Sequence, residues 1–339
     1  MQVAVRGAEA QDEPFLWEML FEAAHMAEDG ATSAESARRD PFLARYVAGW
    51  GQPGDVGVIA AEPESGRPVG AAWARLLEAV PGAASEEDAS LPEVAVAVVP
   101  ELRGRGVGAQ LLAALLDAAR PFYGALALSV RADNPARRLY ERAGFAAVRT
   151  IVNRVGGTSL MMRADLLYDP AASLRLVEPD EAWRERLLVM AREHSLAGWD
   201  RYERALGDFE GWLRRTRDYA AERGQPAGLV PETFYCSAAG DTLVGVIRLR
   251  HRLSPALEEY GGHIGYDIRP SLRGRGLGTR QLALCLEQAR ARGLARVLVT
   301  CDDDNLVSVR VIEKNGGVLA DKRFHAPTGK LVRRYWIEV

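Results

Sequence analysis

The sequence predicts an α/β fold made of two similar domains in tandem. The first observation is a repeated string: "LRGRGVG" begins at Leu102, and "LRGRGLG" begins at Leu272, in a chain of 339 residues. The second is that a similar succession of strand-like and helix-like segments surrounds each copy. A repeat offset of half the chain indicates a duplicated domain rather than a solenoid, whose repeating units are much shorter.

Each half opens with a short strand and a helix. "QVAVRGA" precedes "DEPFLWEMLFEAAHMA" in the first half, and "SLRLVEP" precedes "DEAWRERLLVMAREH" in the second. Two strand-like runs follow: "DVGVIAAE" and "PVGAAWARLLEA" in one half, "TFYCSAAG" and "TLVGVIRLRHRL" in the other. The second half carries an extra helical stretch, "DFEGWLRRTRDYAAERG". The aromatic residues in and just before it could line a pocket, but aromatic residues at helical spacing usually face the core, and we expect that here.

The repeated string stands between a strand and a long helix in both halves. "PEVAVAVVP" and "GGHIGYDIRP" lead into it, and "AQLLAALLDAAR" and "TRQLALCLEQARARG" follow with apolar residues at helical spacing. A strand, a helix and one closing strand complete each half. We place the domains at residues 1–167 and 174–339, because "YDPAAS" at 168–173 is a short, proline-containing linker.

Composition excludes several classes of protein. The net charge of -3 argues against a general nucleic-acid or membrane-surface binder. No run approaches the roughly 20 apolar residues of a membrane span, and the N-terminus does not resemble a signal peptide. The three cysteines, Cys236, Cys285 and Cys301, are far apart, which predicts reduced thiols and no metal site. We therefore expect a cytoplasmic protein without nucleic-acid or membrane partners.

The strand, glycine-rich turn and helix together predict an anion site. Such a turn presents backbone N–H groups at a helix N-terminus, and arginine adds charge. The strings lack the Gly-Lys-Ser/Thr ending of a P-loop, and Gly104, Gly106 and Gly108 do not have dinucleotide-binding spacing. A single copy is equally consistent with a solvated structural turn. Two copies at matching places favour a phosphate-bearing ligand.

The motif R-x-x-G-x-G between a strand and a long helix resembles the acetyl-CoA pyrophosphate site of the GCN5-related N-acetyltransferases. "ADNPARRLYERAGF" is similar to that family's N-x-A-x-x-x-Y-x-x-x-G-F segment, and "DDNLVSVRVIEKNGG" is its relative without the tyrosine. The resemblance covers nearly the whole chain. It implies two domains, each with a mixed, twisted central sheet flanked by helices, and acetyl-CoA as cofactor.

The resemblance also implies which residues bind the cofactor. In the first half they are Val98, Val99, Arg103, Gly104, Arg105, Gly106, Val107, Gly108 and Asn134. In the second half they are Ile268, Arg273, Gly274, Arg275, Gly276, Leu277, Gly278, Asn305 and Ser308. In the family, the pantetheine arm lies where the strand before the motif splays from the next strand.

Acetyl transfer to an amine needs an acid for the leaving thiolate. Tyr140 is the candidate, because a phenol with a pKa near 10 can protonate a thiolate. The alternative is a tyrosine that only packs on its helix. The second half has Val311 at the matching step from Asn305, and Ser308 or Cys301 are weak substitutes.

The reaction also needs a group that takes the proton of the amine. Glu93 and His263 each lie ten residues before the arginine that begins a motif, at the start of the preceding strand. His263 has the better intrinsic pKa, about 6.5, and Glu93 would act through water. The alternatives are a solvated strand end for Glu93 and a hydrogen-bonded structural histidine for His263.

The sequence thus predicts an acetyl-CoA-dependent N-acetyltransferase that acts by direct attack in a ternary complex. The acceptor would be a primary amine of a small molecule or a protein. The first half has every expected group. The second half either uses another acid or only binds cofactor. The alternative is an acyl-CoA-binding sensor or scaffold without turnover. We expect either a monomer, whose halves imitate a dimer, or a homodimer.

Overall fold

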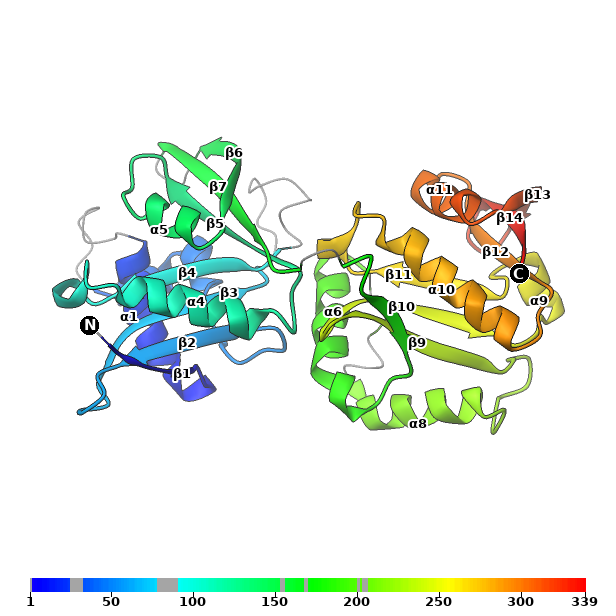
Figure 1. The fold of residues 1–339 in the computed structure, drawn as a ribbon, viewed down its shortest axis with the longest axis horizontal. Helices are drawn as coiled ribbons and strands as arrows, with labels where there is room; N and C mark the ends of the chain where they lie inside the picture. The colour runs from blue at the N-terminus through cyan, green and yellow to red at the C-terminus, as the bar shows by residue number, and fades with distance from the viewer. Residues whose placement is uncertain are drawn as a thin grey trace. The chain divides into compact units, whose positions relative to one another are not determined.

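The computed structural model describes residues 2–24, 33–77, 91–152, 156–167, 170–199, 202 and 207–339. Its contacts divide the chain into two compact units, Met1–Tyr168 with Ser195–Trp199 and Asp169–His194 with Asp200–Val339 (Figure 1). The first two residues of the linker predicted at 168–173 lie outside the described residues. The two units are described separately below.

The first unit contains a seven-stranded sheet in the order β1-β2-β3-β4-β5-β7-β6. The strands are β1 (Ala4–Gly7), β2 (Val56–Ala61), β3 (Pro68–Arg75), β4 (Glu93–Val98), β5 (Ala125–Arg131), β6 (Ala146–Val152) and β7 (Thr158–Asp165). The helices are α1 (Glu13–Ala23), α2 (Glu35–Arg39), α3 (Pro41–Ala44), α4 (Val107–Ala119) and α5 (Arg137–Arg142), with the 3-10 turns η1 (Ala10–Asp12) and η2 (Pro100–Leu102). Trp73 of β3 packs in a core with α1, whereas its near neighbour Gly70 faces Leu111 of α4, so the two helices cover opposite faces.

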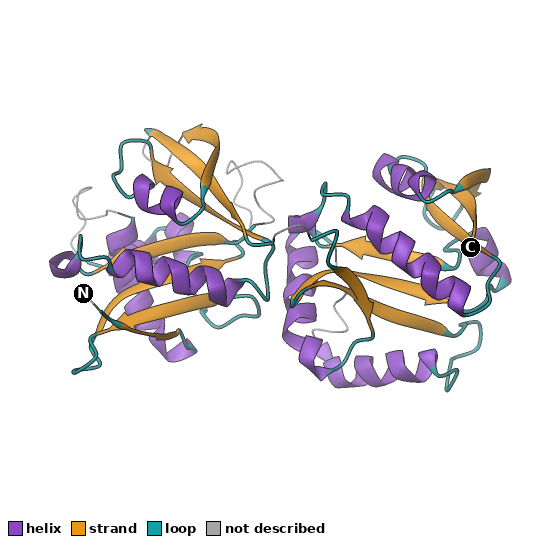
Figure 2. Cartoon of the chain, viewed as in Figure 1, coloured by secondary structure: helices purple, strands orange, loops and turns teal. Residues whose placement is uncertain are grey.

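The second unit repeats this sheet strand for strand, in the order β8-β9-β10-β11-β12-β14-β13. Helices flank the strands of both units (Figure 2). The strands are β8 (Leu174–Val177), β9 (Glu232–Ala239), β10 (Thr242–Arg250), β11 (Ile264–Ile268), β12 (Arg296–Asp302), β13 (Val318–His325) and β14 (Lys330–Glu338). The helices are α6 (Arg184–Leu196), α8 (Phe209–Ala220), α9 (Pro255–Glu259), α10 (Leu277–Ala291) and α11 (Leu306–Lys314), with η3 (Glu181–Trp183) and η4 (Pro270–Leu272). The predicted fold, two mixed sheets flanked by helices, is confirmed.

The sheet of the second unit separates two hydrophobic cores. Cys236 and Val246 pack with α6 and α8, whereas their neighbours Tyr235 and Ile247 pack with α10 and α11. Successive side chains of a strand point to opposite faces, which explains this alternation. Phe209 belongs to the first of these cores, as expected for the aromatic residues of the extra helix. Trp199, in contrast, is exposed.

Each unit ends in a hairpin of two strands, where the sequence predicted one closing strand. β7 lies between β5 and β6, and β14 lies between β12 and β13, in antiparallel pairing throughout. The outer strands β6 and β13 are largely exposed. An edge strand that buries little apolar surface carries a weak hydrophobic pattern, so the sequence did not separate it from the strand beside it.

The centre of each sheet contains a parallel pair that separates almost at once. β4 pairs with β5 only at Glu93 and Ala127, and β11 pairs with β12 only at Ile264 and Val299. On their other sides β4 and β11 have long antiparallel ladders with β3 and β10. Between this pair and the repeated turn the two central strands have no ladder, and we call this unpaired stretch the gap of each unit.

Gly245 of β10, opposite Ile268 at the end of β11, allows the backbones of the two strands to approach closely. A Cβ at Gly245 would lie 2.2 Å from the carbonyl oxygen of Asp267, so Gly245→Ala must displace β11. We expect a loss of about 1–3 kcal/mol in the free energy of unfolding, as for other overpacked sites. Gly265→Ala is the matched control, because the nearest atom, Nη2 of Arg248, is 3.9 Å away. Urea denaturation followed by circular dichroism measures the free energy of unfolding of both variants. Equal losses would contradict the conclusion that the close approach of β11 requires glycine at position 245.

Candidate active site

The repeated turns have the same backbone conformation in both units. Gly104 and Gly106 have φ angles of +73° and +81°, and Gly274 and Gly276 have +78° and +74°. No atom lies within 4 Å of a Cβ at any of the four, so the left-handed backbone, not crowding, is what requires glycine there.

The helix that follows each turn begins without a side-chain cap. Gly106 and Gly276 are the N-cap residues of α4 and α10, and no acidic residue stands in either first turn. The first N–H groups of a helix have no partner within the helix, and the helix dipole favours negative charge there. Both helix ends can therefore accept an anion such as pyrophosphate.

The arginine that begins each motif folds back onto the preceding strand. Nε of Arg103 donates to the carbonyl of Val98 at 3.1 Å, and Nε of Arg273 donates to the carbonyl of Ile268 at 3.2 Å. The first helix of each unit anchors the turn differently. Glu22 of α1 forms an ion pair with Arg103 itself. Glu193 of α6 instead binds Arg269, at 2.5 Å, just before the second turn.

The third glycine of each motif gives a structural alignment of the helices α5 and α11. A Cβ at Gly108 would lie 3.4 Å from Leu139, and one at Gly278 would lie 3.5 Å from Val311. Val311 thus takes the place of Leu139, and Ile312, which is fully buried, takes that of Tyr140. The expectation that Val311 stands opposite Tyr140 was wrong by one residue.

The shift arises because the two helices start at different distances from their asparagines. Asn305 is itself the N-cap of α11, and its Oδ1 accepts from the N–H of Ser308 at 3.0 Å. Oδ1 of Asn134 accepts from the N–H of Ala136 at 2.8 Å, and α5 begins only at Arg137. Both asparagines therefore organise the helix start beside the gap.

Tyr140 lies on α5 with its ring in edge contact with Phe145, at a centroid distance of 6.1 Å. Burial raises the pKa of the Tyr140 phenol above its usual value near 10. The phenol is therefore protonated at neutral pH, which is the state that a proton donor requires.

Glu93 lies at the closed end of the first gap, where it accepts a hydrogen bond from the hydroxyl of Tyr46. Burial, followed by the charge of Glu93, raises the pKa of Tyr46 well above its usual value. Tyr46 thus stays protonated and donates to the carboxylate. This hydrogen bond holds the side chain of Glu93 in one orientation.

His263 is a structural histidine in this fold. Its Nδ1 accepts a hydrogen bond from the backbone N–H of Leu298 at 2.9 Å, so the neutral ring carries its proton on Nε2. Burial, with a smaller contribution from Arg250, lowers the pKa of His263 to about 4. With its one lone pair already occupied, the neutral ring cannot take a proton from an amine. The geometry therefore contradicts the expectation of a base at this position.

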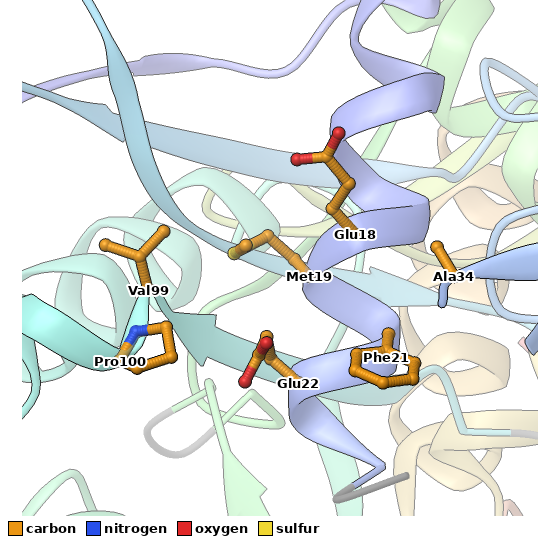
Figure 3. Close-up of a pocket in the computed structure, with 7 residues that line it drawn as sticks. All are labelled: Glu18, Met19, Phe21, Glu22, Ala34, Val99 and Pro100. Carbon is orange, nitrogen blue, oxygen red and sulfur yellow. The ribbon is translucent and has the colours of Figure 1, made fainter. Parts of the chain in front are cut away.

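A cavity of about 270 Å³ lies between α1 and the end of β4 (Figure 3). Its lining residues are Glu18, Met19, Phe21, Glu22, Ala34, Val99 and Pro100. Glu18 and Glu22 contribute carboxylates to this lining, and that of Glu22 also forms the ion pair with Arg103. It opens beside the residues that lead into the first turn.

Burial keeps two cysteines of the second unit in the thiol form. Burial raises the pKa of Cys285 to about 12 and that of Cys301 to about 11, so both remain thiols. Among the described residues, no cluster of histidine, cysteine and carboxylate side chains could hold a metal ion. Nor is any helix in those parts of the chain both long and apolar enough to cross a bilayer.

Each half of this α/β protein thus has an uncapped helix start beside a gap between parallel strands, an arrangement that is suited to a phosphate-bearing ligand. Residues 17–145 match the acetyltransferase (GNAT) family, and residues 173–318 match the acetyltransferase (GNAT) domain. The chain belongs to the GNAT family and is an acetyltransferase with two such domains in tandem.

The chain is also similar to curated relatives that are named acetyltransferases. The mycothiol acetyltransferase of Thermobispora bispora is 30% identical over 261 residues, which is 74% of this chain and 81% of the relative. That of Acidothermus cellulolyticus is 26% identical over 237 residues, 66% of this chain and 68% of the relative. The structure of yncA, a putative acetyltransferase from Salmonella typhimurium with its cofactor acetyl-CoA, has 21% identity and a TM-score of 0.36, covering 53% of this chain and 99% of that one.

Sequence reasoning missed two side chains of the first site. Glu22 lies in a helix that the sequence predicted, but nothing in the pattern indicates a partner 81 positions away. Tyr46 lies in a segment without a recognisable motif, 47 positions from Glu93. Both pairings are long-range contacts, which a single sequence does not reveal.

The buried, neutral His263 predicts a pH dependence of stability. The unfolded state takes up a proton near pH 6.5, whereas the folded state does so only near pH 4. Stability is therefore fully present above pH 6.5 and falls as the pH drops toward 4. His263→Asn keeps an acceptor for the N–H of Leu298 but cannot titrate. Between pH 7.5 and 4.5 the denaturation midpoint should fall less steeply with decreasing pH in this variant than in the parent protein. If the two proteins lose stability in parallel, His263 does not cause the pH dependence.

Proposed function

We propose that this acetyltransferase uses acetyl-CoA as donor and transfers the acetyl group directly to a primary amine in a ternary complex. The observation that carries the proposal is the twice-repeated turn, with its left-handed glycines and uncapped helix end beside a gap between strands. A glycine-rich turn at a helix N-terminus suits a pyrophosphate, and a gap between strands suits an extended pantetheine arm.

The residues of this chain fit such a donor. The N–H groups of the turn and of the first helical residues would hold the pyrophosphate, with Arg103 and Arg105 in one half and Arg273 and Arg275 in the other. When bound, the donor supplies an acetyl thioester. The backbone of Val98, Val99 and Ile268 would face it at the open end of each gap, where β4 and β11 have left their parallel neighbours.

The first half also has groups suited to the acceptor. The carboxylates of Glu18 and Glu22 line the cavity beside Val99 and would attract a protonated amine. Glu93, oriented by Tyr46, would take the proton of the amine through water. Tyr140 would give a proton to the sulfur that leaves. Because the relatives are named mycothiol acetyltransferases, we suggest the unacetylated precursor of mycothiol as the first acceptor to test.

The number of bound donors tests the proposed binding sites. Native mass spectrometry with excess acetyl-CoA should detect two bound molecules per chain. Arg103→Glu and Arg273→Glu each place a negative charge where the pyrophosphate would lie, so each variant should retain one. A chain that binds no acetyl-CoA would contradict the proposal.

Tyr140→Phe tests the acid of the first half. The experiment uses the Arg273→Glu background, so that only the first half binds donor. Thiol release should fall on the order of 10²-fold or more while the bound acetyl-CoA is retained, because the leaving thiolate loses its proton donor. Unchanged turnover would remove Tyr140 from the mechanism. No turnover in the parent with any amine would favour a sensor instead.

A further inference from the structure

The second gap contains a phenol that has no counterpart in the first. Tyr266 is the third residue of β11, two residues beyond the single pair with β12 at Ile264 and Val299. It lies opposite Ile247 on β10, and both pack against the core that involves α10 and α11. The side chain thus lies where the strands have separated, on the face that α11 covers.

The hydroxyl of Tyr266 is buried, and no described residue lies at hydrogen-bonding geometry to it. Burial raises the pKa of Tyr266 to about 12, and the nearby hydroxyl of Ser308, in the first turn of α11, opposes this in part. Cys301 of β12 is a further neighbour. A buried hydroxyl without a partner is unfavourable unless something else supplies one.

The alignment of the two units shows an exchange of side chains. Gly70 pairs with Val98 as Gly245 pairs with Ile268, so the residue of β4 that matches Tyr266 is Val96. On the helix, Ile312 stands where the first unit has Tyr140. The candidate proton donor of the first unit, Tyr140, is therefore on the helix, whereas the phenol of Tyr266 in the second unit is on the strand.

We propose that Tyr266 is the proton donor of a second acetyl-transfer site, built in the second half and acting on a primary amine. This inference rests on the proposed function and concerns the half that lacks the helical tyrosine. The nitrogen of the amine forms a bond to the acetyl carbon, and the carbon–sulfur bond breaks. The sulfur keeps the electron pair and takes the proton of Tyr266. The amine gives one proton to water, and water returns one to Tyr266.

The first test measures binding. In the Arg103→Glu background, calorimetry compares coenzyme A with desulfo-coenzyme A, which lacks the thiol. Tyr266→Phe should weaken the binding of coenzyme A about 3- to 10-fold, the usual range for one hydrogen bond, and leave the affinity for desulfo-coenzyme A unchanged. Equal effects on both ligands, or none on either, would overturn the proposal. Tyr235→Phe, which removes another phenol from the same core, is the matched control and should change neither affinity.

The second test measures turnover in both backgrounds. Tyr266→Phe should lower thiol release on the order of 10²-fold in the Arg103→Glu protein and leave the Arg273→Glu protein unchanged. Tyr140→Phe should show the opposite pattern. If the Arg103→Glu protein binds acetyl-CoA but never transfers it, the second half is only a binding domain and this inference fails, whereas the proposed function stands on the first half. If no half transfers acetyl groups, the proposed function itself fails.

Discussion

The single hydrogen-bonded position between the two parallel strands at the centre of each sheet determines how these units can bind ligands. Backbone groups of a strand need partners, and beyond this position the facing edges of β4 and β11 have none on the neighbouring strand. The antiparallel ladders with β3 and β10 hold the other edges in register. One edge of each strand is thereby fixed while the other is open to a ligand that is long and carries its own polar groups.

The glycine-rich turn follows the open strand edge in both units. An acidic residue of the first helix forms an ion pair near this turn, but with a different arginine in each unit. In the first unit Glu22 binds Arg103, the arginine of the motif, so an anionic ligand must compete with a carboxylate for that side chain. In the second unit Glu193 binds Arg269, before the motif, together with the hydroxyl of Ser271. The same fold thus presents its anion site with different electrostatic surroundings. The two halves therefore differ in the partner of the acidic residue on their first helix and in the position of the phenol.

Much of the fold could be read from the sequence because it follows from local periodicity. The strand before each motif, the long helix after it and the repeat itself are all visible as patterns of apolar residues and glycines. The second closing strand was missed because β6 and β13 bury little. The match of Val311 to Tyr140 was wrong because counting from an asparagine assumes equal helix starts, whereas α5 and α11 begin at different distances from it.

The candidate site depends more on tertiary contacts than on local sequence motifs. The glycines and arginines of the turns could be identified because left-handed backbone and anion binding require particular residue types. The surroundings of Glu93, His263 and Tyr266 could not be identified in this way, because each contacts a residue of another element. Glu93 contacts Tyr46, His263 contacts the backbone of Leu298, and Tyr266 lies near Ser308 of α11. Sequence alone therefore determined the fold class and the positions of the two glycine-rich turns, because both follow from local patterns. Packing established which histidine is structural and which hydroxyl is left without a partner, because burial and hydrogen bonding arise only when distant segments meet.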